Sequence, residues 1–138
     1  MEKISGKKNI LVIDDEEGIR TMLETRLYKC GYMVDTAGNG LHAMQKLRSG
    51  NHYDLIICDL KMPGMSGADL FKEIKNMKHK EVPFLLITGY PEKDKLTGAL
   101  RSGIKDIMLK PLRFNNLMEK VEILIGPIEL DIAKKAAA

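Results

Sequence analysis

The sequence of 138 residues lacks the features that mark membrane, secreted and zinc-binding proteins. Its apolar runs fall short of the roughly 20 residues that cross a bilayer, and the first runs into Asp14 and Asp15 where a signal peptide would stay apolar. Two cysteines, Cys30 and Cys58, are too few for a disulfide framework, and no Cys/His spacing fits a zinc site. We therefore expect a cytoplasmic protein, away from membranes, in which both cysteines are small buried residues.

The chain also has little excess of one charge over the other. The 22 basic and 19 acidic residues leave a net charge of +3, and the lysines are scattered without interleaved aromatic residues. Such a pattern does not favour direct binding to nucleic acid. The three histidines, His42, His52 and His79, stand among polar or charged neighbours, so they are expected at the surface. The chain length fits one domain with a single core.

Short apolar runs alternate with longer amphipathic segments along the chain. The apolar runs predict five strands, of which the second is polar enough to lie near an edge: 9–13, 33–37, 54–58, 83–88 and 107–109. The amphipathic segments predict five helices: 17–30, 41–47, 66–77, 91–100 and 114–125. Strands joined through helices run parallel with right-handed crossovers. The sequence therefore predicts an α/β domain over residues 9–125, a parallel sheet with helices on both faces, between an N-terminal extension (1–8) and a short tail (126–138).

Residues suited to one reaction stand where four of these strands end. Asp14 and Asp15 end the first strand, Asp59 the third, Thr88 the fourth and Lys110 the fifth. Since ligands of parallel sheets bind at the carboxyl ends of the strands, these groups are predicted to meet. Crowded carboxylates repel one another, and Mg²⁺ would relieve the repulsion while also binding phosphoryl oxygens. The set suggests that Asp59 attacks phosphorus, with Mg²⁺ and Lys110 offsetting charge and Thr88 donating a hydrogen bond.

Each of these residues alone has a simpler interpretation. The acids from Asp14 to Glu17 could be the N-cap and first-turn residues of a helix, and Asp59 could be a turn residue. Thr88 before Gly89 fits turn chemistry, and Lys110 could be a surface lysine. Their joint placement at four strand ends, with the fifth strand near an edge, favours a shared site.

The chain resembles the receiver domain of two-component response regulators over roughly residues 8–125. Four segments carry the resemblance: ILVIDDEEGIR, DLIICDLKMPGMSGADL, PFLLITGY and IKDIMLKPL. The resemblance implies a flavodoxin-like (βα)5 fold with strand order 2-1-3-4-5. It also implies that Asp59 accepts a phosphoryl group from a phosphohistidine on a sensor histidine kinase or phosphotransfer protein. The chain would then be a phosphoprotein switch that catalyses its own phosphorylation and dephosphorylation, rather than a turnover enzyme.

The resemblance assigns the metal ligands as well. Mg²⁺, or Mn²⁺ in its place, would be held by the carboxylates of Asp15 and Asp59 and by the backbone carbonyl of Lys61. Asp14 would act through metal-bound water. The cofactor implied is thus a divalent cation at the acceptor itself.

The remaining roles concern phosphate binding and switching. Lys110 would pair with the phosphoryl group, and its bond to Pro111 is usually cis in the family. Thr88 would move toward the phosphate and shift the face around the last two helices between two states. Receivers usually carry Tyr or Phe three residues before the lysine, and here that switch position is Ile107. Relay through an aromatic side chain is therefore not expected.

Two further residues bear on the lifetime of the phosphoryl group. Lys61 follows the acceptor by two residues and Tyr90 follows Thr88 by two. The hypothesis is that Lys61 or Tyr90 alters the access of water to phosphorylated Asp59.

Other functions fit the sequence less well. A phosphatase of the haloacid dehalogenase type needs an acid two residues after its nucleophile, where Lys61 stands. A flavin-binding module would not place acids after its first strand. A receiver-like docking module that is never phosphorylated stays open because of Ile107.

The protein partners expected for this chain are inferred from the resemblance alone. The kinase is expected to contact Ile19, Met22 and Leu23 and the loop after Lys110. The output would be a downstream protein or an output domain of a longer chain, and a homodimer is an open alternative.

Overall fold

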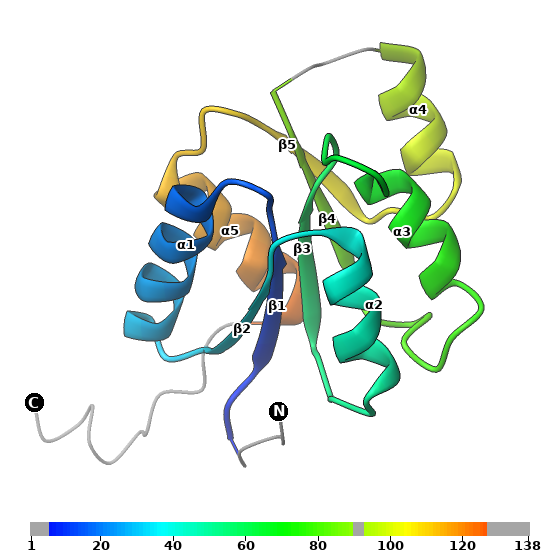
Figure 1. The fold of residues 1–138 in the computed structure, drawn as a ribbon. Helices are drawn as coiled ribbons and strands as arrows, with labels where there is room; N and C mark the ends of the chain where they lie inside the picture. Colours follow the sequence, from blue (N-terminus) through cyan, green and yellow to red (C-terminus); the bar gives the residue numbers. More distant parts are fainter. Residues whose placement is uncertain (1–5, 90–92, 127–138) are drawn as a thin grey trace, which may run out of the picture.

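The computed structural model describes residues 6–89 and 93–126 (Figure 1). Five parallel strands form one sheet in the order β2-β1-β3-β4-β5. They are β1 (Asn9–Ile13), β2 (Met33–Ala37), β3 (Leu55–Asp59), β4 (Phe84–Thr88) and β5 (Asp106–Leu109). The predicted flavodoxin-like strand order is confirmed, and the polar second strand lies at an edge.

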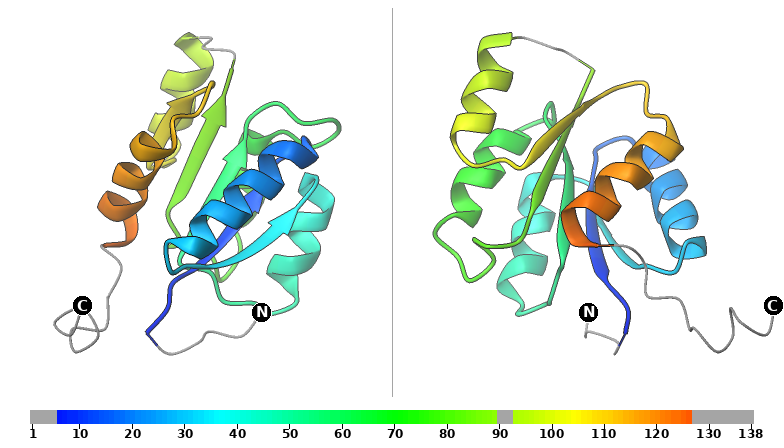
Figure 2. Two further views of the ribbon diagram at one scale, coloured as in Figure 1. Left: turned by 90° about the vertical axis from the view of Figure 1, so that its left-hand side faces the viewer. Right: turned by 180° about the vertical axis from the view of Figure 1, so that it is seen from behind.

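Five helices cover the two faces of the sheet (Figures 1 and 2). They are α1 (Glu17–Lys29), α2 (Gly40–Arg48), α3 (Gly67–Ile74), α4 (Lys93–Arg101) and α5 (Phe114–Ile125). Helices α1 and α5 pack on one face, and α2, α3 and α4 lie on the other. None of the helices in the described ranges is long and apolar enough to span a membrane.

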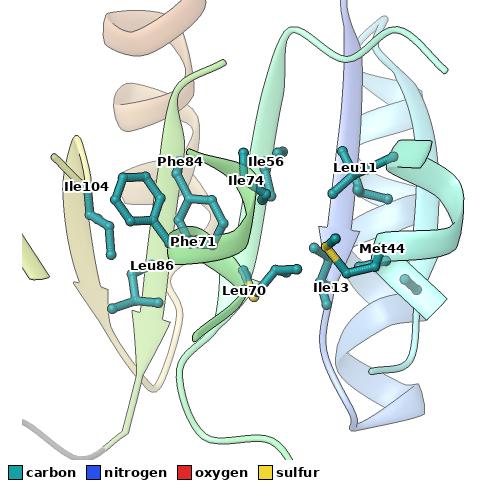
Figure 3. Close-up of a cluster of buried hydrophobic side chains, with 14 of the residues drawn as sticks. Leu11, Ile13, Met44, Ile56, Leu70, Phe71, Ile74, Phe84, Leu86 and Ile104 are labelled. Atoms are coloured by element: carbon teal, nitrogen blue, oxygen red, sulfur yellow. The ribbon is translucent and has the colours of Figure 1, made fainter. Parts of the chain in front are cut away.

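The central strands are buried on both faces, which is why their sequences are continuous apolar runs. In β1, Ile10 and Val12 face α1 and α5, whereas Leu11 and Ile13 face α2 and α3. Figure 3 shows the second of these layers, where Leu11 and Ile13 lie near Met44 of α2. The alternation follows from the two-residue period of a strand.

The start of α3 determines how closely this helix approaches the end of β3. Ser66 is the N-cap: its hydroxyl accepts a hydrogen bond from the Asp69 amide, and the Asp69 carboxylate accepts one from the Ser66 amide. A Cβ atom at Gly67 would lie 2.4 Å from the backbone oxygen of Asp59. Glycine is therefore required for the first turn of α3 to pack against the predicted acceptor.

Several predicted boundaries shift by a few residues. Helix α3 ends at Ile74 rather than near Met77, because tight turns replace the helix there: the Met77 amide bonds the Ile74 carbonyl at 2.9 Å. Strand β3 runs to Asp59, so the predicted acceptor belongs to the strand itself. The predicted helix start at Pro91, and Tyr90, lie outside the described residues, and the described part of α4 begins at Lys93.

The prediction that all three histidines lie at the surface is wrong for His79. Its side chain is 4% exposed, and Nε2 lies 2.8 Å from the backbone oxygen of Asn51. The flanking lysines suggested a solvated loop, but the turns after α3 fold His79 against Tyr53, with ring centroids 6.2 Å apart. The prediction for the cysteines holds for Cys58, which is fully buried, while Cys30 is partly exposed.

A polar cluster ties the edge strand β2 to α2 and to the segment before β3. The Tyr53 hydroxyl donates to Oδ2 of Asp35 at 2.7 Å, and Lys46 pairs with Oδ1 of the same carboxylate. Burial alone would raise the pKa of Asp35, but the hydrogen bonds from Lys46 and Tyr53 outweigh it and hold the pKa below its usual value. The carboxylate is thus ionised and depends on both donors.

Tyr53→Phe is expected to lower the free energy of unfolding by about 1–2 kcal/mol, because Asp35 loses a buried donor. Tyr28→Phe is the matched control, since Tyr28 is 61% exposed and its change should stay within about 0.5 kcal/mol. Urea unfolding measures both. Equal losses in the two variants would show that the Tyr53 hydroxyl does not stabilise the fold.

Candidate functional site

The five strands run parallel, so their carboxyl ends lie at one edge of the sheet (Figure 1), and the predicted residues Asp14, Asp59, Thr88 and Lys110 stand at these ends. Asp14 follows β1 directly, Asp59 is the last residue of β3, and Thr88 is the last residue of β4. Lys110 follows β5, and its amide donates to the Thr88 carbonyl at 2.9 Å. The parallel register therefore brings residues far apart in sequence to adjacent strand ends.

Three carboxylates form the centre of the site. One oxygen from each of Asp14, Asp15 and Asp59 lies within 4.8 Å of the others. Asp14 and Asp59 are buried, whereas Asp15 is exposed. The simpler interpretation of the acids as N-cap and first-turn residues holds for Glu16, the N-cap of α1 without a side-chain cap, and for Glu17, but not for Asp14 and Asp15, which precede the helix. Instead, Oδ1 of Asp14 accepts the Glu16 amide at 2.9 Å and shapes the turn after β1.

The ammonium group of Lys110 lies between the two buried carboxylates. Its Nζ is 3.4 Å from Oδ2 of Asp14 and 3.4 Å from Oδ2 of Asp59. It also lies 3.6 Å from Oε1 of Glu16, a contact that the sequence analysis missed. The position of Glu16, directly after the acidic pair, was the available signal. The peptide bond from Lys110 to Pro111 is cis.

Burial and mutual repulsion perturb the titration of the acids. Burial, followed by the charge of Asp14, raises the pKa of Asp59 to about 6, although Lys110 opposes the rise. The pKa of Asp14 is raised as well, chiefly by burial. For Lys110 burial acts to lower the pKa, but the charges of Asp14 and Asp59 outweigh it and raise the pKa above its usual value. The ammonium group thus remains protonated at neutral pH.

The donor set fits a divalent cation. Three carboxylates against one ammonium group leave a net charge of −2 when all four are ionised. These are hard oxygen ligands, and exposed Asp15 opens the cluster to solvent. Such a set suits Mg²⁺, which keeps several waters and uses one or two carboxylates.

The remaining predicted residues are Thr88, Ile107 and Lys61. Thr88 is fully buried at the end of β4. Ile107 of β5 is half-buried and packs against the cluster that covers the face of α2, α3 and α4. Lys61 is exposed in the loop after β3.

A groove of about 340 Å³ adjoins the acid cluster at Asp15. The β2–α2 and β3–α3 loops form its walls, and its lining residues are Asp15, Gly38, Asn39, Gly40, Leu41, Pro63, Gly64 and Met65. Leu41 is 66% exposed beside it. Asp15 can therefore be approached from solvent on this side.

Comparisons with known proteins agree with this geometry. The family model for the response regulator receiver domain matches residues 10–122. The transcriptional regulatory protein ZraR of Klebsiella oxytoca is 40% identical over 115 residues, which cover 83% of this chain and 26% of ZraR. The chemotaxis protein CheY1 of Helicobacter pylori is 33% identical over 119 residues, which cover 85% of this chain and 96% of CheY1.

Solved structures show the same similarity. The response regulator TrrA of Thermotoga maritima, crystallised in complex with Mg²⁺–BeF, is 40% identical with a TM-score of 0.73, and the match covers 85% of this chain and 98% of TrrA. CheY4 of Vibrio cholerae is 28% identical with a TM-score of 0.80, over 86% of this chain and 98% of CheY4. The chain spans about a quarter of the length of ZraR but nearly all of CheY1. On the family match, the fold and the site, the chain belongs to the response regulator receiver domains of two-component signal transduction.

Proposed function

We propose that Asp59 is the phosphoacceptor of this receiver domain and takes a phosphoryl group from a phosphohistidine of a partner protein. The observation that carries the proposal is the position of the Lys110 ammonium group, 3.4 Å from both Asp59 and Asp14 within a cluster of three acids. Receiver domains as a family are phosphoacceptor switches rather than conventional enzymes. The proposal assigns that role to particular atoms of this chain.

The transfer forms a bond between a carboxylate oxygen of Asp59 and phosphorus, while the phosphorus–nitrogen bond of the donor breaks. The departing ring nitrogen keeps the electron pair of that bond and takes up one proton from solvent, so the donor side chain leaves as neutral imidazole. Because the pKa of Asp59 is about 6, its carboxylate is largely ionised and nucleophilic at neutral pH. Lys110 is placed to offset the negative charge of the transferring group.

The acids have a second role, which is to hold the cation. The family binds Mg²⁺, and the ligands proposed here are the carboxylates of Asp15 and Asp59 with the backbone carbonyl of Lys61, while Asp14 acts through water. Bound Mg²⁺ would polarise the phosphoryl oxygens. Asp15 is exposed and can receive the ion from solvent, whereas buried Asp14 keeps Lys110 in place.

Incubation with acetyl phosphate tests the proposal directly. The protein should gain the mass of one phosphoryl group in the presence of Mg²⁺ and not in EDTA, and Asp59→Asn should abolish the gain. Glu73→Gln is the control, since Glu73 is an exposed carboxylate of α3 outside its capping box. A chain that gains no phosphate under any condition would be a docking module, and sustained release of phosphate from unrelated monoesters would indicate a phosphatase.

The donor and the output belong to the same proposal. Ile19 and Met22 of α1 are partly exposed and remain candidates for contact with a histidine kinase or phosphotransfer protein, whereas Leu23 is buried in the core. Thr88 and Ile107 would relay phosphorylation to the face of α4, β5 and α5. We expect this face to bind a downstream protein or an output domain, because relatives such as ZraR are named transcriptional regulators.

A further inference from the structure

Arg20 of α1 reaches back to the acid cluster without being one of its acids. Its Nη1 donates a hydrogen bond of 2.7 Å to the backbone carbonyl of Asp14. The side chain is half-buried, and six residues separate the donor from the acceptor. Helix α1 is thereby fastened to the turn that carries both Asp14 and Asp15.

The bond has a consequence for the orientation of Asp15. The carbonyl of Asp14 belongs to the planar peptide group that precedes Asp15, so fixing its oxygen fixes that plane. The amide of Glu16 belongs to the peptide group that follows Asp15, and it donates to Oδ1 of Asp14 at 2.9 Å. Hydrogen bonds therefore fix both peptide groups next to Asp15. Arg20 supplies one of these bonds from helix α1.

The β2–α2 loop leaves room for this contact at Gly38. A Cβ atom there would lie 3.2 Å from Nη1 of Arg20 and 3.5 Å from Cζ. The first distance is tighter than an ordinary contact, so a side chain at Gly38 would push the guanidinium by tenths of an ångström. Gly38 thus lies next to the Arg20 side chain. A substitution at Gly38 can disturb the hydrogen bond from Arg20 to the Asp14 carbonyl without removing the charge of Arg20.

We propose that Arg20 is a positioning residue that aims the carboxylate of Asp15 at the divalent cation through its hydrogen bond to the Asp14 carbonyl. The inference rests on the proposed function, because it concerns the same cation site. Asp15 is exposed, so its orientation depends on its backbone more than on surrounding packing. Partners that orient metal ligands in this way commonly change metal affinity by about 10- to 100-fold when they are removed.

The direction in which Mg²⁺ affinity changes when Arg20 is removed distinguishes a positioning role from a purely electrostatic one. Arg20 carries a permanent positive charge near a cation site. If its charge were all that mattered, removing it would tighten Mg²⁺ binding, since like charges repel. If it positions Asp15, removing it weakens binding despite the loss of repulsion.

Calorimetric titration with Mg²⁺ alone, without a phosphodonor, measures the effect. Arg20→Gln is expected to raise the dissociation constant for Mg²⁺ by about tenfold, and Gly38→Ala should raise it by about two- to threefold through the displaced guanidinium. With acetyl phosphate, the Mg²⁺ concentration needed for half the maximal phosphorylation rate should rise in parallel, while the rate at saturating Mg²⁺ recovers. A purely structural role would not produce this recovery.

Arg26→Gln is the control. It removes a positive charge from the same helix about 9 Å further along the helix axis, and the Arg26 side chain lies over the ring of Phe114 and not at the acid cluster. Its dissociation constant for Mg²⁺ should match the wild type. An unchanged or lowered constant in Arg20→Gln, or in Gly38→Ala if the first variant does not fold, overturns the inference. A wild-type protein that binds no Mg²⁺ overturns the proposed function instead.

Discussion

Lys110→Met is expected to slow phosphorylation by acetyl phosphate by about 100- to 1,000-fold. The ammonium group lies 3.4 Å from Oδ2 of Asp59, so it is placed beside the oxygen that would attack phosphorus. Methionine keeps the unbranched stem and removes the charge that would stabilise the transferring group. The rate constant follows from intact mass measured over time at saturating Mg²⁺.

The same variant should bind Mg²⁺ at least as tightly as the wild type. Lys110 competes with the cation for Asp14 and Asp59, and its removal leaves the three carboxylates to the metal. Lys120→Met serves as the control, since Lys120 pairs with Asp106, the first residue of β5, at the other end of the strand from Lys110. A phosphorylation rate within about threefold of the wild type would show that Lys110 does not act on the transferring group.

The placement of the proposed site residues at one edge of the sheet could be predicted because they stand at the ends of strands. A parallel sheet places Asp14, Asp59, Thr88 and Lys110 at one edge whatever the details of the loops between them. The strand order could not be worked out from periodicity and came from the resemblance. Strand boundaries were accurate to within one residue, since continuous apolar runs mark strands that are buried on both faces.

The missed features depend on contacts that no periodicity in the sequence marks. Glu16 approaches Lys110 across the gap between the β1–α1 and β5–α5 loops, and the one sequence signal, its position directly after the acidic pair, does not identify Lys110 as its partner. His79 is buried by a turn that folds onto Tyr53, although its sequence neighbours are charged. Arg20 occupies an ordinary helical position. Its proposed role depends on a hydrogen bond to the backbone carbonyl of Asp14, and residue types alone do not indicate such a bond.

Asp59→Asn is expected to stabilise the metal-free protein at pH 8 by about 1–3 kcal/mol. The folded state raises the pKa of Asp59 from its model-peptide value of 3.8 to about 6, mainly through burial and then through the charge of Asp14. Ionisation therefore costs stability in the folded state. The cost is absent below about pH 4, grows between pH 4 and pH 6, and is complete above pH 6. Asparagine has nearly the same shape and avoids it.

Urea unfolding in EDTA at several pH values measures this cost. The advantage of Asp59→Asn should shrink as the pH falls through 6, whereas Glu24→Gln, which removes an exposed carboxylate of α1, should stay within about 0.5 kcal/mol throughout. Equal stability of wild type and Asp59→Asn at pH 8 would contradict the raised pKa. Mg²⁺ at ten times its dissociation constant should restore about 1.4 kcal/mol to the wild type and less to the variant. Asp59, the proposed acceptor, is thus expected to be a residue at which this domain gives up stability for the sake of the proposed binding of a cation and a phosphoryl group.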